Sequence, residues 1–221
     1  MKIFFAFLMM SHSFLVFATN AKKIPKLYQS AVAKGAVYNI LHETKYLRLS
    51  TLQEKGAQFP WQFVERIKGK KGAAFIIAIT ENNELILGQQ RRIPVQAEVL
   101  ALPGGLIGDK NSETTICETA KNELQEETGY FVDLDDLEIV NVAPSSEGLT
   151  NELHHVIFAK KAATNLQVLT LENAEKHAKL HPILIKLDEI EQKLEEKKKN
   201  GIFVDNKIYQ ALYYLRKFGH M

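Results

Sequence analysis

Residues 122–130 read NELQEETGY, and they close a segment that we predict to be a helix over residues 114–128. Apolar side chains recur at four-residue intervals along this segment, which places them on one side of the helix. This apolar stripe consists of Ile116, Ala120 and Leu124. Gly129 follows the last helical residue, a position where glycine commonly ends a helix. The segment is therefore predicted to pack one face on a protein core.

Three carboxylates share one side of the same helix. Glu123, Glu126 and Glu127 occupy positions i, i+3 and i+4, which are neighbours on a helix surface. Close carboxylates repel one another at neutral pH, so a divalent cation or basic neighbours would stabilise them. Hard oxygen ligands select Mg²⁺, Ca²⁺ or Mn²⁺, and Mg²⁺ is often shared with substrate phosphates. The competing interpretation is an exposed acidic helix face, which three glutamates by themselves favour.

The residues around these glutamates resemble the Nudix hydrolases. The family's box is a glycine, five residues, a glutamate, seven residues, Arg-Glu, an aliphatic residue, any residue, Glu-Glu, any residue, a glycine and an apolar residue. Gly105 and residues 122–130 match it, except that Asn122 stands where the family has arginine. Counting forward from Gly105 puts the box glutamate at residue 111, whereas counting back from Asn122 puts it at 114. The loop is thus three residues longer than in the family's box, and neither position holds a glutamate. Glu113 is the glutamate nearest to the second position.

Further stretches are similar to those of one branch of the family, the ADP-ribose and nucleoside-diphosphate-sugar pyrophosphatases. These stretches are residues 90–95 (QRRIPV), 102–109 (LPGGLIGD) and 148–152 (GLTNE). Ala101 departs from the branch, which commonly has glutamate two residues before the proline. The resemblance implies an α/β fold, the Nudix α/β/α sandwich. In it a mixed β-sheet carries the catalytic helix of the Nudix box on one face and a C-terminal helix on the other.

The activity that the resemblance implies is Mg²⁺-dependent hydrolysis of the pyrophosphate bond of a nucleoside diphosphate linked to another group. ADP-ribose or a sugar nucleotide is the first candidate substrate, and Mn²⁺ is an alternative cation. The metal ligands would be Gly105, through its carbonyl, with Glu123, Glu126 and Glu127. The catalytic residues would be Glu123 and Glu127, with Glu152 as general base in an irregular loop.

Three further side chains are candidates for substrate binding. Arg92 follows a predicted strand and can clamp a phosphate through two hydrogen bonds, although an ordinary surface ion pair is the alternative. Trp61 and Arg66 lie at the two ends of another predicted strand. Trp61 can stack on a nucleobase, or it can make a core or dimer contact. The resemblance also implies a homodimer formed through the N-terminal strand region.

Two rivals remain open beside this activity. The first keeps the fold but hydrolyses another substrate, such as a dinucleoside polyphosphate or a coenzyme A derivative. The second is a degenerate Nudix module that binds a nucleotide without turnover, and it is favoured by Asn122, Ala101 and the missing box glutamate. Fold alone does not separate them, because specificity depends on the loops around a site.

Hydrophobic periodicity predicts the remaining elements. The predicted strands are residues 61–66, 73–79, 84–90, 98–102, 137–142 and 154–159, and the predicted helices are residues 28–36, 188–199 and 206–218. Residues 73–79 and 84–90 are predicted to form a hairpin that turns at Asn82 and Asn83.

The overall composition limits the kinds of partner and of site that the protein can have. With 28 Lys and Arg against 26 Asp and Glu, the formal net charge is +2, so nothing favours a nucleic acid as partner. An apolar content of 46% is typical of a globular protein. Cys117 is the single cysteine, which excludes an intrachain disulfide and a cysteine-cluster zinc site.

The N-terminus resembles an export signal. Residues 1–21 are predicted to be a signal peptide, because Lys2 precedes an apolar run and small residues follow it. The run is interrupted and shorter than the roughly 20 residues that cross a bilayer, so no stable membrane anchor is expected. Export to a periplasm or medium follows, and a cytoplasmic protein with an N-terminal helix is the alternative. Residues 22–60 are predicted to be an extension that takes part in a dimer interface, and residues 61–221 the Nudix domain.

Overall fold

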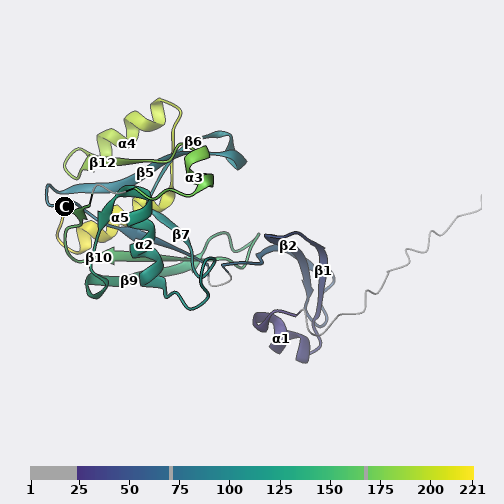
Figure 1. The fold of residues 1–221 in the computed structure, drawn as a ribbon. Coiled ribbons are helices and arrows are strands. Elements are labelled where there is room, and N and C mark those ends of the chain that lie inside the picture. The colour runs from purple at the N-terminus through teal and green to yellow at the C-terminus, as the bar shows by residue number, and fades with distance from the viewer. Residues whose placement is uncertain (1–23, 70–71, 167–168) are drawn as a thin grey trace, which may run out of the picture.

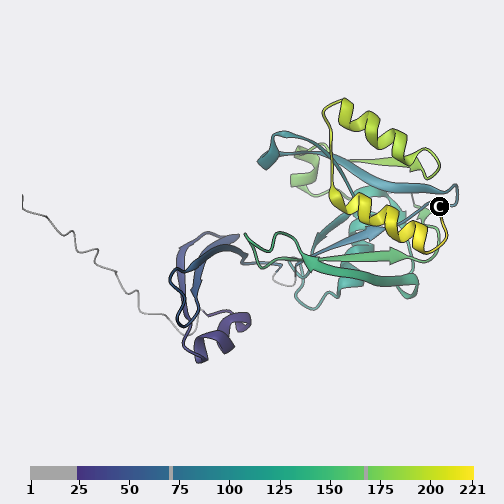
Figure 2. The same cartoon turned by 180° about the vertical axis from the view of Figure 1, so that it is seen from behind.

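The N-terminal part of the chain forms a small sheet of its own. The computed structural model describes residues 24–69, 72–166 and 169–221, so the predicted signal peptide at residues 1–21 lies outside the described part. Three antiparallel strands pair in the order β1-β2-β3, and one helix precedes them. These elements are α1 (Lys26–Ala33), β1 (Val37–Glu43), β2 (Leu47–Gln53) and β3 (Trp61–Arg66). In Figures 1 and 2, α1, β1 and β2 stand to one side of the other sheets and helices, and the loop before β10 (Leu153–Ala159) contacts α1 through Asn151, whose side-chain amide donates to the Tyr28 hydroxyl at 3.0 Å.

Two four-stranded sheets form the body, ordered β7-β4-β10-β9 and β12-β5-β6-β13. Each contains one parallel pair, β10 with β4 and β13 with β6, so both sheets are mixed. Their strands are β4 (Ala73–Ile77), β5 (Glu84–Arg92), β6 (Ala97–Ala101), β7 (Gly104–Leu106), β9 (Leu137–Pro144), β10 (Leu153–Ala159), β12 (His181–Lys186) and β13 (Phe203–Val204). β8 (Tyr130–Phe131) and β11 (Thr164–Asn165) form a further pair. The predicted α/β class is confirmed, with two mixed sheets in place of one.

Helices cover both sides of the β4 sheet. The helices of the body are α2 (Ile116–Thr128), α3 (Asn173–His177), α4 (Ile190–Lys199) and α5 (Asn206–Lys217), with short 3₁₀ turns at Ile93–Val95 and Leu134–Asp136. Ile76 packs in one buried cluster with Leu124 of α2, whereas Ile77 packs in another with Leu212 of α5. Successive side chains of a strand point to opposite faces, so a strand covered on both sides is apolar throughout. The predicted placement of one helix on each face is confirmed.

The predicted hairpin of residues 73–79 and 84–90 is only partly correct. β4 and β5 belong to different sheets. Only the turn between them is closed as in a hairpin, by a bridge between Ile79 and Leu85 and by the Ile86 amide, which donates to the Ala78 carbonyl at 3.0 Å. Beyond the turn, β4 pairs with β7 and β10, while β5 pairs with β6 and β12. Pairing partners distant in the sequence therefore separate the two arms.

The helix of the Nudix box begins and ends by local rules. Thr115 accepts a hydrogen bond from the Glu118 amide, and the Glu118 side chain accepts one from the Thr115 amide, a reciprocal capping box. Gly129 has a φ of 75°, a left-handed conformation that glycine adopts without strain. Within the described residues, no helix is long and apolar enough to span a bilayer.

Candidate active site

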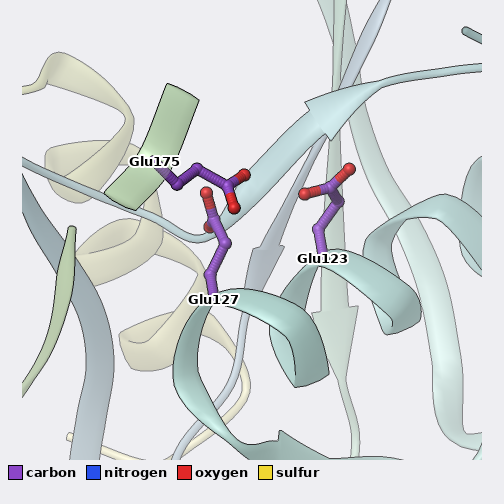
Figure 3. Close-up of side chains that lie close together, drawn as sticks. All are labelled: Glu123, Glu127 and Glu175. Carbon is purple, nitrogen blue, oxygen red and sulfur yellow. The ribbon is translucent and has the colours of Figure 1, made fainter. Parts of the chain in front are cut away.

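Two glutamates of α2 are buried beside the end of strand β7. Glu123 is 9% exposed and Glu127 is 5% exposed. Figure 3 shows both side chains rising from α2, while Glu175 extends from α3 toward Glu127. One carboxylate oxygen from each of the three glutamates lies within 4.8 Å of the other two. Carboxylates from two elements distant in the sequence therefore converge on one point.

The first two residues of β7 approach these carboxylates with their main chain. The Gly104 amide donates a hydrogen bond to Glu127 Oε2 at 3.0 Å. A Cβ atom added to Gly105 would lie 2.2 Å from Glu123 Oε1, a distance that atoms do not tolerate. Glycine is therefore required at residue 105, because a side chain would occupy the space that the Glu123 carboxylate fills.

Burial and mutual repulsion make the charged forms of these glutamates costly. Burial, with the charge of Glu126 adding to it, raises the pKa of Glu123 to about 7 against the opposing charge of Lys110. Burial and the charge of Glu123 raise the pKa of Glu127 to about 8. A divalent cation would remove this cost, and carboxylate oxygens are the ligands that Mg²⁺ and Mn²⁺ take. The donor set and the glycine turn thus fit a hard divalent ion.

Glu126, the third glutamate selected from the sequence, lies outside this group of three. Its Oε2 is 2.7 Å from Nζ of Lys110, which also lies 2.8 Å from Oε1 of Glu172. Glu172 is the residue that precedes α3. A metal-binding role for Glu126 stays a prediction, and it requires the carboxylate to leave Lys110.

A second group of predicted site residues gathers where the loop before β10 meets β3. Glu152 Oε1 accepts a hydrogen bond from Arg66 Nε at 3.0 Å. Trp61 donates from Nε1 to the Gly148 carbonyl at 3.2 Å, and its side chain is 63% exposed, which rules out a core role within this chain. The structure thus brings Arg66, Trp61 and Glu152 to one interface, and Glu152 is not among the three converging carboxylates.

Arg92 lies at the exposed end of β5. Its charge lowers the pKa of Glu127, opposing the larger effect of burial. A substrate-binding role for Arg92 stays a prediction, and a guanidinium is suited to it because it can pair with a phosphate through two hydrogen bonds.

Sequence reasoning missed Glu175 and Lys110. The only local signal around Glu175 is a capping box, in which the Glu172 amide donates to Glu175 Oε2 at 2.6 Å. That pattern predicts the start of a helix and says nothing of a metal. Lys110 lies in the extended loop between Gly105 and α2, where no spacing points to Glu126.

Comparisons with known proteins identify the family. The family model of the NUDIX domain matches residues 69–206, more than half of the chain. The chain belongs to the Nudix hydrolase family. The match begins after β3, so the predicted Nudix domain of residues 61–221 starts earlier than the family model, and β3 pairs with the N-terminal sheet.

Individual proteins add to the family assignment. The chain is 30% identical over 145 residues to the methanol dehydrogenase activator of Bacillus methanolicus, covering 66% of this chain and 72% of that one. It is 31% identical over 90 residues to the ADP-ribose pyrophosphatase of Bacillus subtilis (strain 168), covering 41% of this chain and 46% of that one. A crystal structure of an ADP compounds hydrolase matches with a TM-score of 0.64 at 17% identity, over 84% of this chain and 95% of that one. The structural match at 17% identity supports the fold, and the match to the ADP-ribose pyrophosphatase agrees with the resemblance of the sequence motifs to the ADP-ribose branch.

Proposed function

We propose that this protein hydrolyses the pyrophosphate bond of a nucleoside diphosphate linked to another group, with ADP-ribose or a sugar nucleotide as substrate and Mg²⁺ or Mn²⁺ as cofactor. The observation that carries the proposal is the convergence of Glu123, Glu127 and Glu175, with Gly104 of β7 bonded to Glu127 and Gly105 close against Glu123. The similarity to the Bacillus subtilis ADP-ribose pyrophosphatase supports the substrate class.

The chain supplies the ligands and the positioning for this reaction. Glu123 and Glu127 would hold the cation, with Glu126 and the Gly105 carbonyl as further ligands. When bound, the cation neutralises charge on the diphosphate and activates or orients a water. The water oxygen forms a bond to phosphorus, the bridging P–O bond breaks, and a carboxylate takes the proton of the water.

Two carboxylates are candidates for the general base. The sequence motif selects Glu152, whose carboxylate lies on Arg66. The geometry adds Glu175, whose carboxylate lies within the group that would hold the cation. A general base has to reach a water beside the metal, so proximity favours Glu175. Arg92 would bind a substrate phosphate, while Arg66 and Trp61 would contact the nucleoside part from the N-terminal sheet.

The test is a screen of purified protein against a panel of nucleotides with added Mg²⁺. The panel contains ADP-ribose, sugar nucleotides, a dinucleoside polyphosphate and a coenzyme A derivative, and released phosphate is measured after phosphatase coupling. We expect the highest kcat/KM on ADP-ribose or a sugar nucleotide, and no turnover after dialysis against a chelator. A higher kcat/KM on another member of the panel would show that the proposed substrate class is wrong. Binding without turnover on any member would support a non-catalytic module.

We further propose that two copies associate through the N-terminal sheet. Its exposed apolar side chains include Val37, Leu41, Leu47, Leu49 and Trp61. Exposed apolar groups concentrated on one small sheet are typical of a protein interface. Light scattering on the eluting protein tests this, and we expect a dimer mass that Leu49→Glu reduces to a monomer mass.

Export remains a proposal that rests on residues 1–21 alone. N-terminal sequencing of the native protein should begin near Thr19 or Lys22. Recovery of intact Met1 from a cytoplasmic fraction would refute it.

A further inference from the structure

The ammonium group of Lys110 forms ion pairs with two carboxylates that border the proposed metal site. Lys110 Nζ contacts Glu126 Oε2 at 2.7 Å and Glu172 Oε1 at 2.8 Å. One of these carboxylates comes from α2 and the other from the residue that precedes α3. A single lysine therefore neutralises charge on the two elements that supply Glu123, Glu127 and Glu175.

The electrostatic effect of this lysine extends into the buried group. Its charge favours the ionised form of Glu123 and lowers the pKa of that carboxyl against the larger effect of burial. Burial of the lysine opposes its own charged form, yet the contacts with Glu126 and Glu172 raise the pKa of Lys110 above its ordinary value. The two contacts hold the ammonium group of Lys110 between the carboxylates of Glu126 and Glu172.

The loop that carries Lys110 places it over a small cavity. Together with Asp109, Asn122, Glu123 and Glu126, Lys110 lines a space of about 220 Å³ beside α2. Its side chain is 49% exposed, and its long stem can swing away from the carboxylates. A half-exposed ion pair is weak, so a stronger cation can displace it.

We propose that Lys110 is an internal counter-ion that competes with the divalent cation for the carboxylate of Glu126. This inference rests on the proposed metal site. A carboxylate oxygen that accepts from Nζ at 2.7 Å cannot also ligate a metal ion closely without bringing two like charges together. Ligation of the metal ion by Glu126 therefore requires Lys110 to leave that carboxylate. Before the metal binds, the lysine offsets carboxylate repulsion, and so it stabilises the protein and weakens its affinity for metal.

The test measures Mn²⁺ binding to the full chain by the electron spin resonance of free Mn²⁺, after chelation and dialysis. We expect Lys110→Met to lower the Kd for Mn²⁺ roughly two- to fivefold, the upper part of the range that a screened surface ion pair supplies. Lys110→Arg keeps the charge and should restore a Kd close to that of the unsubstituted protein.

Lys121→Met is the matched control. It removes one positive charge from α2, but Lys121 lies over the ring of Phe131, with Nζ 4.5 Å from the centroid, and contacts none of the clustered carboxylates. Its Kd for Mn²⁺ should change less than twofold, which separates the local contact from the change in net charge.

Thermal unfolding gives a second readout. In a chelator, Lys110→Met should unfold at a lower temperature than the unsubstituted protein, and saturating Mn²⁺ should raise its Tm by more, because tighter binding gives a larger shift. If the unsubstituted protein binds Mn²⁺ and the Kd of Lys110→Met is unchanged or higher, the proposed competition is wrong while the proposed metal site stands. Absence of Mn²⁺ binding in both proteins overturns the proposed metal site together with this inference.

Discussion

The main chain of Gly105 lies so close to the carboxylate of Glu123 that the two residues fix each other's place. A Cβ atom on residue 105 would stand 2.2 Å from Oε1 and 2.4 Å from the carboxyl carbon of Glu123. Gly105 has no left-handed φ, so its requirement for glycine is one of space rather than of backbone conformation. Strand β7 and helix α2 are thus in close contact at Glu123, a candidate metal ligand.

Gly105→Ala is accordingly predicted to displace the Glu123 side chain while the fold survives. We expect turnover to fall by about two orders of magnitude, because a small misplacement of a catalytic group is costly. Steady-state kinetics and Mn²⁺ titration check this. Gly148→Ala is the control, since a Cβ there meets nothing within 4 Å. Full activity in Gly105→Ala would show that Glu123 is not a ligand.

Glu126→Gln is predicted to lower turnover by roughly two to four orders of magnitude, because it removes a metal ligand worth several kcal/mol at the transition state. Size and helix propensity are retained. Glu118→Gln in the same helix is the control, and it should be tolerated because glutamine also completes the capping box. Equal losses at the two positions, measured as kcat, would contradict the metal role of Glu126.

Glu175→Gln and Glu152→Gln distinguish the two candidates for the general base. We expect Glu175→Gln to lower kcat about a hundredfold and to flatten the acidic limb of the pH–rate profile. Glu152→Gln should cost less than about tenfold, since its carboxylate lies on Arg66 in a partly exposed ion pair. The reverse ranking of the two kcat values would restore Glu152 as the base.

Arg92→Ala is predicted to raise KM about tenfold or more with a smaller change in kcat, because a charge-assisted contact to a substrate phosphate is lost. Arg91→Ala is the neighbouring control, and its guanidinium instead donates to Gln96 Oε1 at 3.1 Å. Similar KM values for the two variants would leave Arg92 as an ordinary surface charge.

The stability of the chelated protein is predicted to fall as pH rises. Burial raises the pKa of Glu123 to about 7 and that of Glu127 to about 8, against an ordinary value of 4.5. Between pH 4.5 and about 8, the two carboxyls hold more protons in the folded chain than in the unfolded one. The free energy of unfolding therefore decreases as pH rises through this range. Urea unfolding across this range checks the sign.

The variant Glu127→Gln tests whether Glu127 contributes to this change of the free energy of unfolding with pH. Because glutamine does not ionise, the variant should unfold at a higher urea concentration than the unsubstituted protein near the upper end of the range, in chelator. Saturating Mg²⁺ should remove the difference by stabilising the ionised carboxylates. A slope that is identical in both proteins would show that Glu127 does not titrate in this window.

Local patterns in the sequence were sufficient for the helix of the Nudix box. The apolar stripe, the capping residues and Gly129 all act within a few residues of one another, and α2 extends over Ile116–Thr128, close to the predicted 114–128. The strand at residues 61–66 was predicted correctly for the same reason, because its alternation is local. β1 and β2 were not predicted, since their apolar side chains do not alternate regularly and several of them remain exposed.

The sequence by itself determined the family, the helix of the Nudix box and the spacing of Glu123, Glu126 and Glu127, because a helix sets the positions of residues three and four apart. Only the tertiary structure decided which carboxylates converge. It placed Glu175 beside Glu127 and Lys110 on Glu126, and it separated β4 from β5 into different sheets. These contacts join residues distant along the chain, so they depend on how the sheets and helices pack together and leave no periodic signal in the sequence.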